Sequence, residues 1–330
     1  MMRASQDRFI PALRRLALAL LLGMPLAAQS QTYPARTVKI IVPATAGGGL
    51  DVMARILAPK LSESWGQPVV IENRPGANFT LGTDLVAKSA PDGYTLLFVS
   101  TGALTVAPAV YPNLAYNTLR DLIPVTLTSS NPFMLLVANS VPANSVQELL
   151  AHLRANPGKL NHAANNSASL ILASEMLKSL AKVDYVDINY KGAIQAVTSL
   201  VSGESHLCII DPVTAIGILR GGRVRALAVT SPQRFRLQPD LPTMNEAGVP
   251  GYAASAWGVL LTPAKTPADI VAKLNATAVR AMTTPEVTAR FEAVGAEVIG
   301  SSTEEAYRVL RADTERWVTL VRERNIRIAE

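Results

Sequence analysis

The chain has 330 residues, a single cysteine and a formal net charge of +6. One cysteine excludes an internal disulfide, and Cys208 lies in the apolar run HLCII, where we expect a small buried hydrophobe. A chain of this length exceeds what one core usually serves, so two lobes are expected.

The first thirty residues have the pattern of a secretory leader. Four arginines precede an apolar run from residue 16 to residue 26, and the small residues AAQS follow, which predicts cleavage near Ala28 to Ser30. Two of these arginines, Arg14 and Arg15, are adjacent and also allow a twin-arginine signal, but no further feature of such a signal surrounds them. No later segment reaches about eighteen uninterrupted apolar residues, so we expect an exported, periplasmic chain without a membrane span.

Removal of the leader takes away four arginines and one aspartate and lowers the net charge from +6 to +3. Lysine and arginine are dense only in RGGRVR (residues 220–225) and RERNIR (residues 322–327), which fit a solvated surface. We therefore expect no nucleic-acid partner.

Short runs rich in Val, Ile and Leu then alternate with helical patterns. The helical patterns are SVQELLAHLRANPG, SLILASEMLKSLAK and AIQAVTSLVSGE. The strand candidates, in chain order, are TVKIIVP, PVVIEN, YTLLFVS, VDYVDINY, SHLCIID and RVRALAVTS. This alternation predicts an α/β fold of βαβ units with mostly parallel, buried sheets flanked by helices.

Helices dominate the chain after residue 263. Helix starts are expected where a capping residue precedes an acidic one, at Ser145 with Glu148, at Thr266 with Asp269 and at Ser302 with Glu305. The last helix carries an apolar stripe that indicates a core or docking face, formed by Tyr307, Leu310, Thr314, Trp317 and Val321.

Two extended stretches could carry the chain between the lobes, IPVTLTSSNPFMLLVAN and YAASAWGVLLTP. They would make the first lobe discontinuous, with residues 31–129 plus 253–330, and leave residues 130–252 as the second lobe. A cleft would open between the lobes, and such clefts are preferred ligand sites.

The stretch VKIIVPATAGGGLDVMARI places a glycine-rich turn between a strand and a helix. Helix N-termini expose N–H groups and attract anions, so Thr45, Ala46, Gly47 and Gly48 are candidate ligand contacts. Asp51 lies in the first helical turn, where a carboxylate favours the helix dipole. The dinucleotide and phosphate-loop motifs are both absent, so a carboxylate is the preferred anion, and a simple tight turn stays open.

Three further segments could reach the same ligand. One is the end of the strand candidate YTLLFVS, with Ser100 and Thr101. The polar turn NHAANNSASL could supply donors or could be a plain capping loop. Asp211 precedes a proline and fits a helix N-cap, and it could also meet a ligand amine or hydroxyl. The candidate residues of these segments are Ser100, Thr101, Asn165, Asn166, Ser167, Ser169 and Asp211.

Catalysis finds little support in the motifs. No HExxH or GxSxG motif occurs, and no local spacing assembles a metal site, so no cofactor and no metal are expected. His152, His162 and His206 are expected to be surface residues or satisfied polar packing.

The motifs together resemble those of the Bug-type solute receptors, the extracytoplasmic components of tripartite tricarboxylate transporters. The resemblance runs through VPATAGGGLDVMARILAPKLSESWGQPVVIENRPGA, APDGYTLLF, NPGKLNHA, INYKG, RVRALAVTS, LPTMNEAGVPGY and SAWGVLLTPAKTP, in that order. It implies a two-lobed periplasmic-binding-protein fold of type II, hinged by two crossover strands. It also implies capture of a small carboxylate or amide by two loops, a membrane permease as partner, and a monomer.

The chain departs from this family at several positions. Leu50 stands where Thr or Ser is common, Ala103, Leu104 and Ala107 occupy a segment that is often polar, and the second loop lacks its usual glycines and histidine. Since an unpaired buried charge is costly, we expect a ligand with one carboxylate and a less polar or aromatic remainder. The rival hypotheses are an exported enzyme that uses Asp211 with a histidine, a sensory binding protein, and the effector-sensing part of a transcription regulator.

Overall fold

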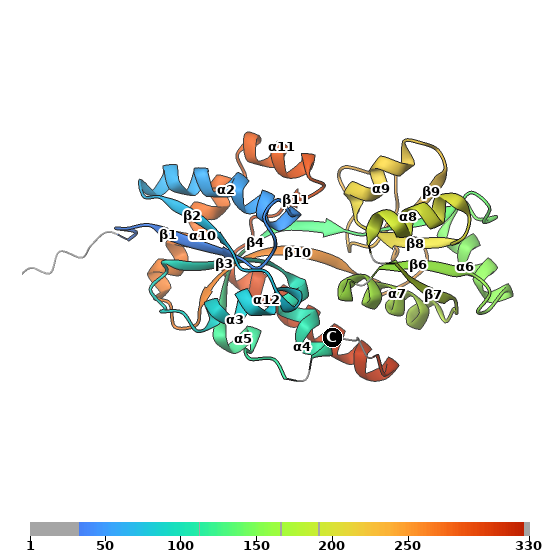
Figure 1. Cartoon of the computed structure of the whole chain (residues 1–330), viewed down its shortest axis with the longest axis horizontal. Coiled ribbons are helices and arrows are strands. Elements are labelled where there is room, and N and C mark those ends of the chain that lie inside the picture. Colours follow the sequence, from blue (N-terminus) through green and yellow to red (C-terminus); the bar gives the residue numbers. More distant parts are fainter. Residues whose placement is uncertain (1–32, 112, 166, 191, 327–330) are drawn as a thin grey trace, which may run out of the picture. The chain divides into compact units, whose positions relative to one another are not determined.

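A computed structural model of the chain describes residues 33–111, 113–165, 167–190 and 192–326 (Figure 1). The expected leader and Asn166 lie outside the described residues. From Arg36 onward the described residues form one compact unit built on two β-sheets. No helix among the described residues is both long and apolar enough to cross a bilayer.

The first sheet has six strands in the order β11-β4-β10-β3-β1-β2. Its strands are β1 (Val38–Val42), β2 (Val69–Asn73), β3 (Thr95–Ser100), β4 (Leu122–Pro132), β10 (Ser255–Pro263) and β11 (Glu297–Val298). The longer helices beside it are α2 (Gly49–Trp65), α3 (Thr80–Ala87), α10 (Ala268–Met282), α11 (Pro285–Ala293) and α12 (Thr303–Arg324). Four short elements join them, namely η1 (Ala77–Phe79), η2 (Gly102–Val106), α4 (Ala107–Val110) and α5 (Thr118–Asp121).

The second sheet has five strands in the order β7-β6-β8-β5-β9. They are β5 (Met134–Ala138), β6 (Asn161–Asn165), β7 (Val186–Tyr190), β8 (Leu207–Ile210) and β9 (Val224–Val229). The helices between them are α6 (Val146–Ala155), α7 (Ala168–Ala181), α8 (Ala193–Ser202) and α9 (Pro212–Leu219).

The α/β class is confirmed, but the sheets are mixed where the alternation predicted mostly parallel ones. Strands β1, β2 and β3 pair in parallel, as do β6, β7 and β8. The strands of the two extended stretches, β4, β5 and β10, pair antiparallel with their neighbours. These strands link one sheet to the other without a βαβ crossover, so nothing forces them to run parallel.

The chain passes between the sheets where β4 ends and β5 begins, and it returns between β9 and β10 (Figure 1). Strands β4 and β10 are paired along this path, so the two passages run side by side. The lobe boundaries drawn from the sequence stay a prediction.

Several local predictions can be checked against the helix ends. Ser145, Asp211 and Ser302 cap their helices with their side chains, as expected. The prediction for Thr266 is wrong, because α10 begins after Pro267 and the Thr266 hydroxyl donates to the carbonyl of Pro263 at 2.8 Å. Cys208 is buried, as expected.

Helix α12 packs on both hydrophobic cores. Ala306 and Leu310 join the core of the six-stranded sheet, whereas Trp317 and Leu320 join the core of the five-stranded sheet. The predicted apolar stripe is therefore a docking face that ties the two sheets together.

Candidate functional site

The β1–α2 turn contains the three consecutive glycines, and the structure gives each a different role. Only Gly47 has a left-handed backbone, with φ of +81°, so only this position demands glycine for conformation. A Cβ on Gly48 would lie 3.2 Å from the Thr45 carbonyl oxygen, and a Cβ on Gly49 would meet nothing within 4 Å. The turn is thus tight at Gly48 and open at Gly49, which leaves room at the start of α2.

A buried carboxylate braces this turn from behind. The Gly47 N–H donates to Asp51 Oδ2 at 2.8 Å, Arg55 Nε donates at 2.9 Å, and Asn73 Nδ2 donates to Oδ1 at 2.9 Å. The hydrogen bond from Arg55 is the main reason that the pKa of Asp51 falls to about 2, against the effect of burial. Asn73 also donates to the carbonyl of Ala44 at 3.0 Å and so ties β2 to the turn.

Asp51 therefore fixes the loop and is not itself exposed to a ligand. The sequence predicted for Asp51 only a favourable interaction with the helix dipole. Its ion pair with Arg55 was predictable, because the two residues are four positions apart in one helix. Asn73 comes from the neighbouring strand and carries no such signal.

Helices α2, α7 and α9 each begin after a parallel strand, and their N-termini differ. Neither Gly48 before α2 nor Ser167 before α7 caps its helix with a side chain. Asp211 caps α9, because its Oδ1 accepts from the Thr214 N–H at 2.9 Å and its Oδ2 accepts from the Thr214 hydroxyl at 2.8 Å. Among the described residues, the N-cap positions of α2 and α7 thus differ from that of α9, whose first turn is satisfied by the side chain of Asp211.

Ser100 belongs to the six-stranded sheet and Ser169 to a helix beside the five-stranded sheet, and the structure brings them together at Gly102. A Cβ on Gly102 would lie 3.5 Å from Ser100 Oγ and 3.7 Å from Ser169 Oγ. Ser100 ends β3, Gly102 opens the π-helical turn η2, and Ser169 lies in the first turn of α7. We call these three residues the serine junction.

Thr101 does not share this position. It is buried, and its Oγ1 accepts from the Trp257 N–H on β10 at 3.2 Å. Its side chain therefore bonds to the strand that returns from the second sheet, beside the serine junction rather than in it.

The remaining candidates are placed by strand direction. Strands β1 and β3 are parallel neighbours, so the exposed Thr45 and Ala46 follow the same sheet edge as Ser100. Strands β6 and β8 are parallel neighbours too, so Asn165 and Asp211 share one edge of the second sheet. Ligands bind outside the carboxyl ends of parallel strands in open α/β sheets, which are the ends where these residues lie.

The apolar residues after β3 correct one expectation. Ala103 and Leu104 are fully buried, Ala107 is 2% exposed, and the first two join the core of the six-stranded sheet. Their apolar character serves packing, so it does not record a loss of ligand contacts. The carbonyls of the π-helical turn are satisfied from within, since Tyr116 OH donates to Ala103 at 2.6 Å and the Thr118 hydroxyl donates to Leu104 at 2.7 Å.

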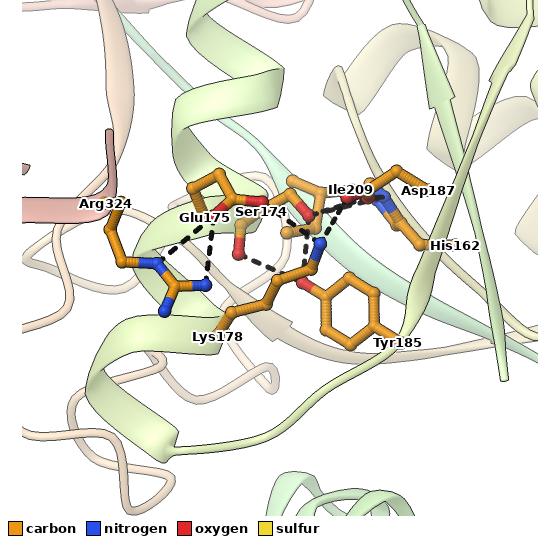
Figure 2. A network of polar contacts seen from close by, with 8 residues as sticks. All are labelled: His162, Ser174, Glu175, Lys178, Tyr185, Asp187, Ile209 and Arg324. Carbon is orange, nitrogen blue, oxygen red and sulfur yellow. Dashed lines mark hydrogen bonds and ion pairs between the residues drawn. The ribbon is translucent and has the colours of Figure 1, made fainter. Parts of the chain in front are cut away.

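A second polar network lies inside the five-stranded part (Figure 2). His162 is fully buried, with Nδ1 at 2.7 Å from Asp187 Oδ1 and Nε2 accepting from the Ile209 N–H at 3.2 Å. Ser174 and Lys178 of α7 also donate to Asp187. Burial disfavours the charge on Asp187, but the bonds from His162 and Lys178 outweigh it and hold its pKa at about 2.

This network is structural in character. Both ring nitrogens of His162 are occupied, which confirms the prediction of satisfied polar packing. Tyr185 OH donates to the Ser174 carbonyl at 3.0 Å, and Arg324 of α12 pairs with Glu175 at 3.2 Å (Figure 2). His206 Nδ1 accepts from the Asn161 N–H at 3.0 Å, and no group of three potential metal ligands occurs among the described residues.

Comparison with known proteins decides the family. The model described as tripartite tricarboxylate transporter family receptor matches residues 53–326. The chain belongs to this receptor family. It is a Bug-type solute-binding protein with the α/β fold of periplasmic binding proteins.

Individual relatives of the receptor family extend over nearly the whole chain. Protein BugT of Bordetella pertussis is 36% identical over 305 residues, which cover 91% of this chain and 93% of BugT. The structure of Rhodopseudomonas palustris Rpa4515 with adipate is 33% identical with a TM-score of 0.72, covering 88% of this chain and 97% of that one. MatC of the same species, with bound malate, is also 33% identical, with a TM-score of 0.70, covering 88% of this chain and 100% of that one.

Proposed function

We propose that this receptor is periplasmic, binds a small organic carboxylate between its two lobes and delivers it to a tripartite tricarboxylate-type permease without any chemical step. The lobes would comprise residues 31–129 with 253–330 and residues 130–252, and the receptor would act as a monomer. The observation that carries the proposal is the serine junction, where a hydroxyl at the end of β3 meets a hydroxyl in the first turn of α7. A ligand that touches both sides would favour the closed state by population shift.

The donors available at this site define the ligand class. Thr45, Ser100 and Ser169 offer hydroxyls, the first turn of α2 offers backbone N–H groups, and the nearby Arg55 cation is paired with Asp51. Hydroxyls and helix N-termini suit one carboxylate, but they provide no cation for a second charge. We therefore infer a ligand with one carboxylate, or an amide in its place, and a less polar remainder. The relatives with adipate and malate support the carboxylate class and leave the ligand of this chain to experiment.

Native mass spectrometry of the mature protein, followed by denaturing extraction, tests the proposal. We expect a stoichiometric small acid that is released unchanged. An empty protein that also gains no thermal stability from a panel of monocarboxylates, dicarboxylates and amides would contradict it. Conversion of an added acid into a product would favour the rival enzyme.

Substitution of Gly48 tests the assignment of the first loop. The φ of Gly48 is −70°, which leucine can adopt, and the Thr45 carbonyl at 3.2 Å from the new Cβ must give by a few tenths of an ångström; the leucine side chain would occupy the space at the start of α2. We expect binding to fall at least a hundredfold with little change in unfolding temperature. Gly217→Leu is the matched control, since Gly217 lies in α9 and its Cβ would meet nothing within 4 Å. Unchanged affinity in Gly48→Leu would remove the first loop from the site.

A further inference from the structure

A cavity of about 540 Å³ lies beside the paired strands that link the two sheets. Its walls come from β4, β10, β11, α12 and residues 231–234, which follow β9. None of the candidate carboxylate-binding residues lines it. Its volume falls in the range of small-molecule sites, about 300–1,000 Å³.

One wall of the cavity carries a buried carboxylate. Asp313 of α12 is 5% exposed, and Arg316 Nη1 lies 2.9 Å from its Oδ1. Burial raises the pKa of Asp313 to about 6, although Arg316 and the side chain of Trp257 both lower it. Arg316 is shared, because its Nη1 also donates to the Ala253 carbonyl at 2.8 Å. A further cationic donor would stabilise the ionised form of Asp313.

Charges of both signs line the cavity in equal number. Its charged residues are Arg234, Arg308 and Arg316 on the positive side, and Glu297, Glu305 and Asp313 on the negative side. A ligand with a net charge would bring an uncompensated charge into this balanced wall, whereas a zwitterion would not. Between the charged groups lie apolar surfaces of Leu127, Val309 and Trp257, which suit a hydrocarbon side chain.

We propose that this cavity is a second ligand site, which binds a small zwitterion of the amino-acid class with an apolar side chain. Its ammonium group donates to Asp313, and its carboxylate accepts from Arg316. The site is independent of the carboxylate site at the serine junction, and either can be lost without the other.

Isothermal titration calorimetry on the mature protein tests this site with L-leucine and L-phenylalanine. Two analogues of leucine separate the charges, since L-leucine methyl ester keeps only the ammonium and 4-methylpentanoate keeps only the carboxylate. We expect each amino acid to bind with a stoichiometry of one and each analogue to bind at least tenfold more weakly than leucine. No heat from either amino acid, or equal affinity for leucine and 4-methylpentanoate, would overturn the proposal.

Variants then locate the binding. Asp313→Asn is expected to weaken leucine binding at least tenfold. Arg311→Gln is the matched control on the same helix, because Arg311 is exposed and does not line the cavity. Gly48→Leu should leave leucine binding intact. Loss of leucine binding in Gly48→Leu, with full binding in Asp313→Asn, would place the amino acid at the serine junction and overturn the second site.

The pH dependence gives an independent readout. Asp313 bonds to Arg316 on its own helix and to Trp257 on β10, and it shares the cavity wall with Arg308, Glu305, Glu297 of β11 and Arg234 after β9. Protonation of Asp313 removes the partner of the ammonium group, so leucine should bind several-fold more weakly at pH 5 than at pH 7.5. In Asp313→Asn this difference should disappear, and its persistence there would contradict the role of Asp313.

Discussion

The helix starts of α2 and α7 supply the two sides of the candidate site, but they are held in different ways. The turn before α2 is braced directly, because the buried Asp51 accepts from its Gly47 N–H. The described anchor of α7 lies further along the helix, where Ser174 and Lys178 donate to Asp187. The first side is therefore held at the loop itself, whereas the anchor of the second side lies about two to three turns into its helix.

The largest effect is expected from Asp51→Asn, which tests the brace on the first side. The charge-assisted bonds of Asp51 account for about 2 kcal/mol of stability, from the pKa of about 2 against the usual 3.8. We expect that loss in denaturant unfolding, together with at least tenfold weaker ligand binding. Asp269→Asn is the control, since Asp269 is an exposed carboxylate in the first turn of α10 and should change stability by less than about 0.5 kcal/mol. Full affinity in Asp51→Asn would show that the loop does not need its brace.

Asp187→Asn breaks the anchor of the second side. Its pKa of about 2 corresponds to about 2 kcal/mol of stability. We expect that loss with affinity changed by less than about threefold, because the network lies below the loop. A loss of affinity as large as in Asp51→Asn would remove the contrast between the two sides.

The free energy of unfolding at acidic pH depends on both carboxylates, those of Asp51 and Asp187. The folded pKa values of Asp51 and Asp187 lie below the usual 3.8, so their contribution is full above about pH 4 and is lost as the pH falls towards 2. The free energy of unfolding should fall less steeply in either asparagine variant than in the parent protein over this window. Parallel curves for parent and variants would contradict the assigned roles.

A smaller effect is expected from Ser169→Ala, which removes one hydroxyl of the serine junction. A single hydrogen bond contributes about 0.5–1.5 kcal/mol, so affinity should fall about two- to tenfold while thermal stability is unchanged. Ser302→Ala should do the reverse, since Ser302 caps α12 and is remote from the junction in the chain. Equal affinity in Ser169→Ala and the parent would remove the second side from the site.

The smallest effect is expected from Arg324→Gln, which breaks the ion pair between α12 and Glu175. The Arg324 side chain is 39% exposed, and such pairs contribute about 0–1 kcal/mol. We expect a change in unfolding temperature of less than about two degrees, because Trp317 and Leu320 hold α12 on the second core. A larger loss would show that the ion pair, and not the apolar face, joins α12 to the second sheet.

The sequence predicts local features of the fold well and long-range ones poorly. Periodicity and turn residues located strands such as β1 and β8, and the caps at Ser145 and Ser302, because these depend on neighbours in the chain. The direction of β4, β5 and β10 depends on how distant segments pair, so their antiparallel pairing was missed. The burial of Ala103 and Leu104 was missed for the same reason.

The candidate site shows the same limit. The glycine turn was visible in the sequence, and Asp51 was visible beside it. The bonds from Asn73 and the approach of Ser169 to Gly102 join residues that are far apart in the chain, so no spacing rule reveals them. Asp211 was predicted as an N-cap and is one, whereas its contact with a ligand stays a prediction.

The most direct test of the central claim is a crystal structure of the mature receptor with its extracted carboxylate. The account predicts that one carboxylate group lies within about 3 Å of a backbone N–H at the start of α2 and of the Ser169 hydroxyl. A carboxylate held by one side alone, or bound away from the serine junction, would contradict it.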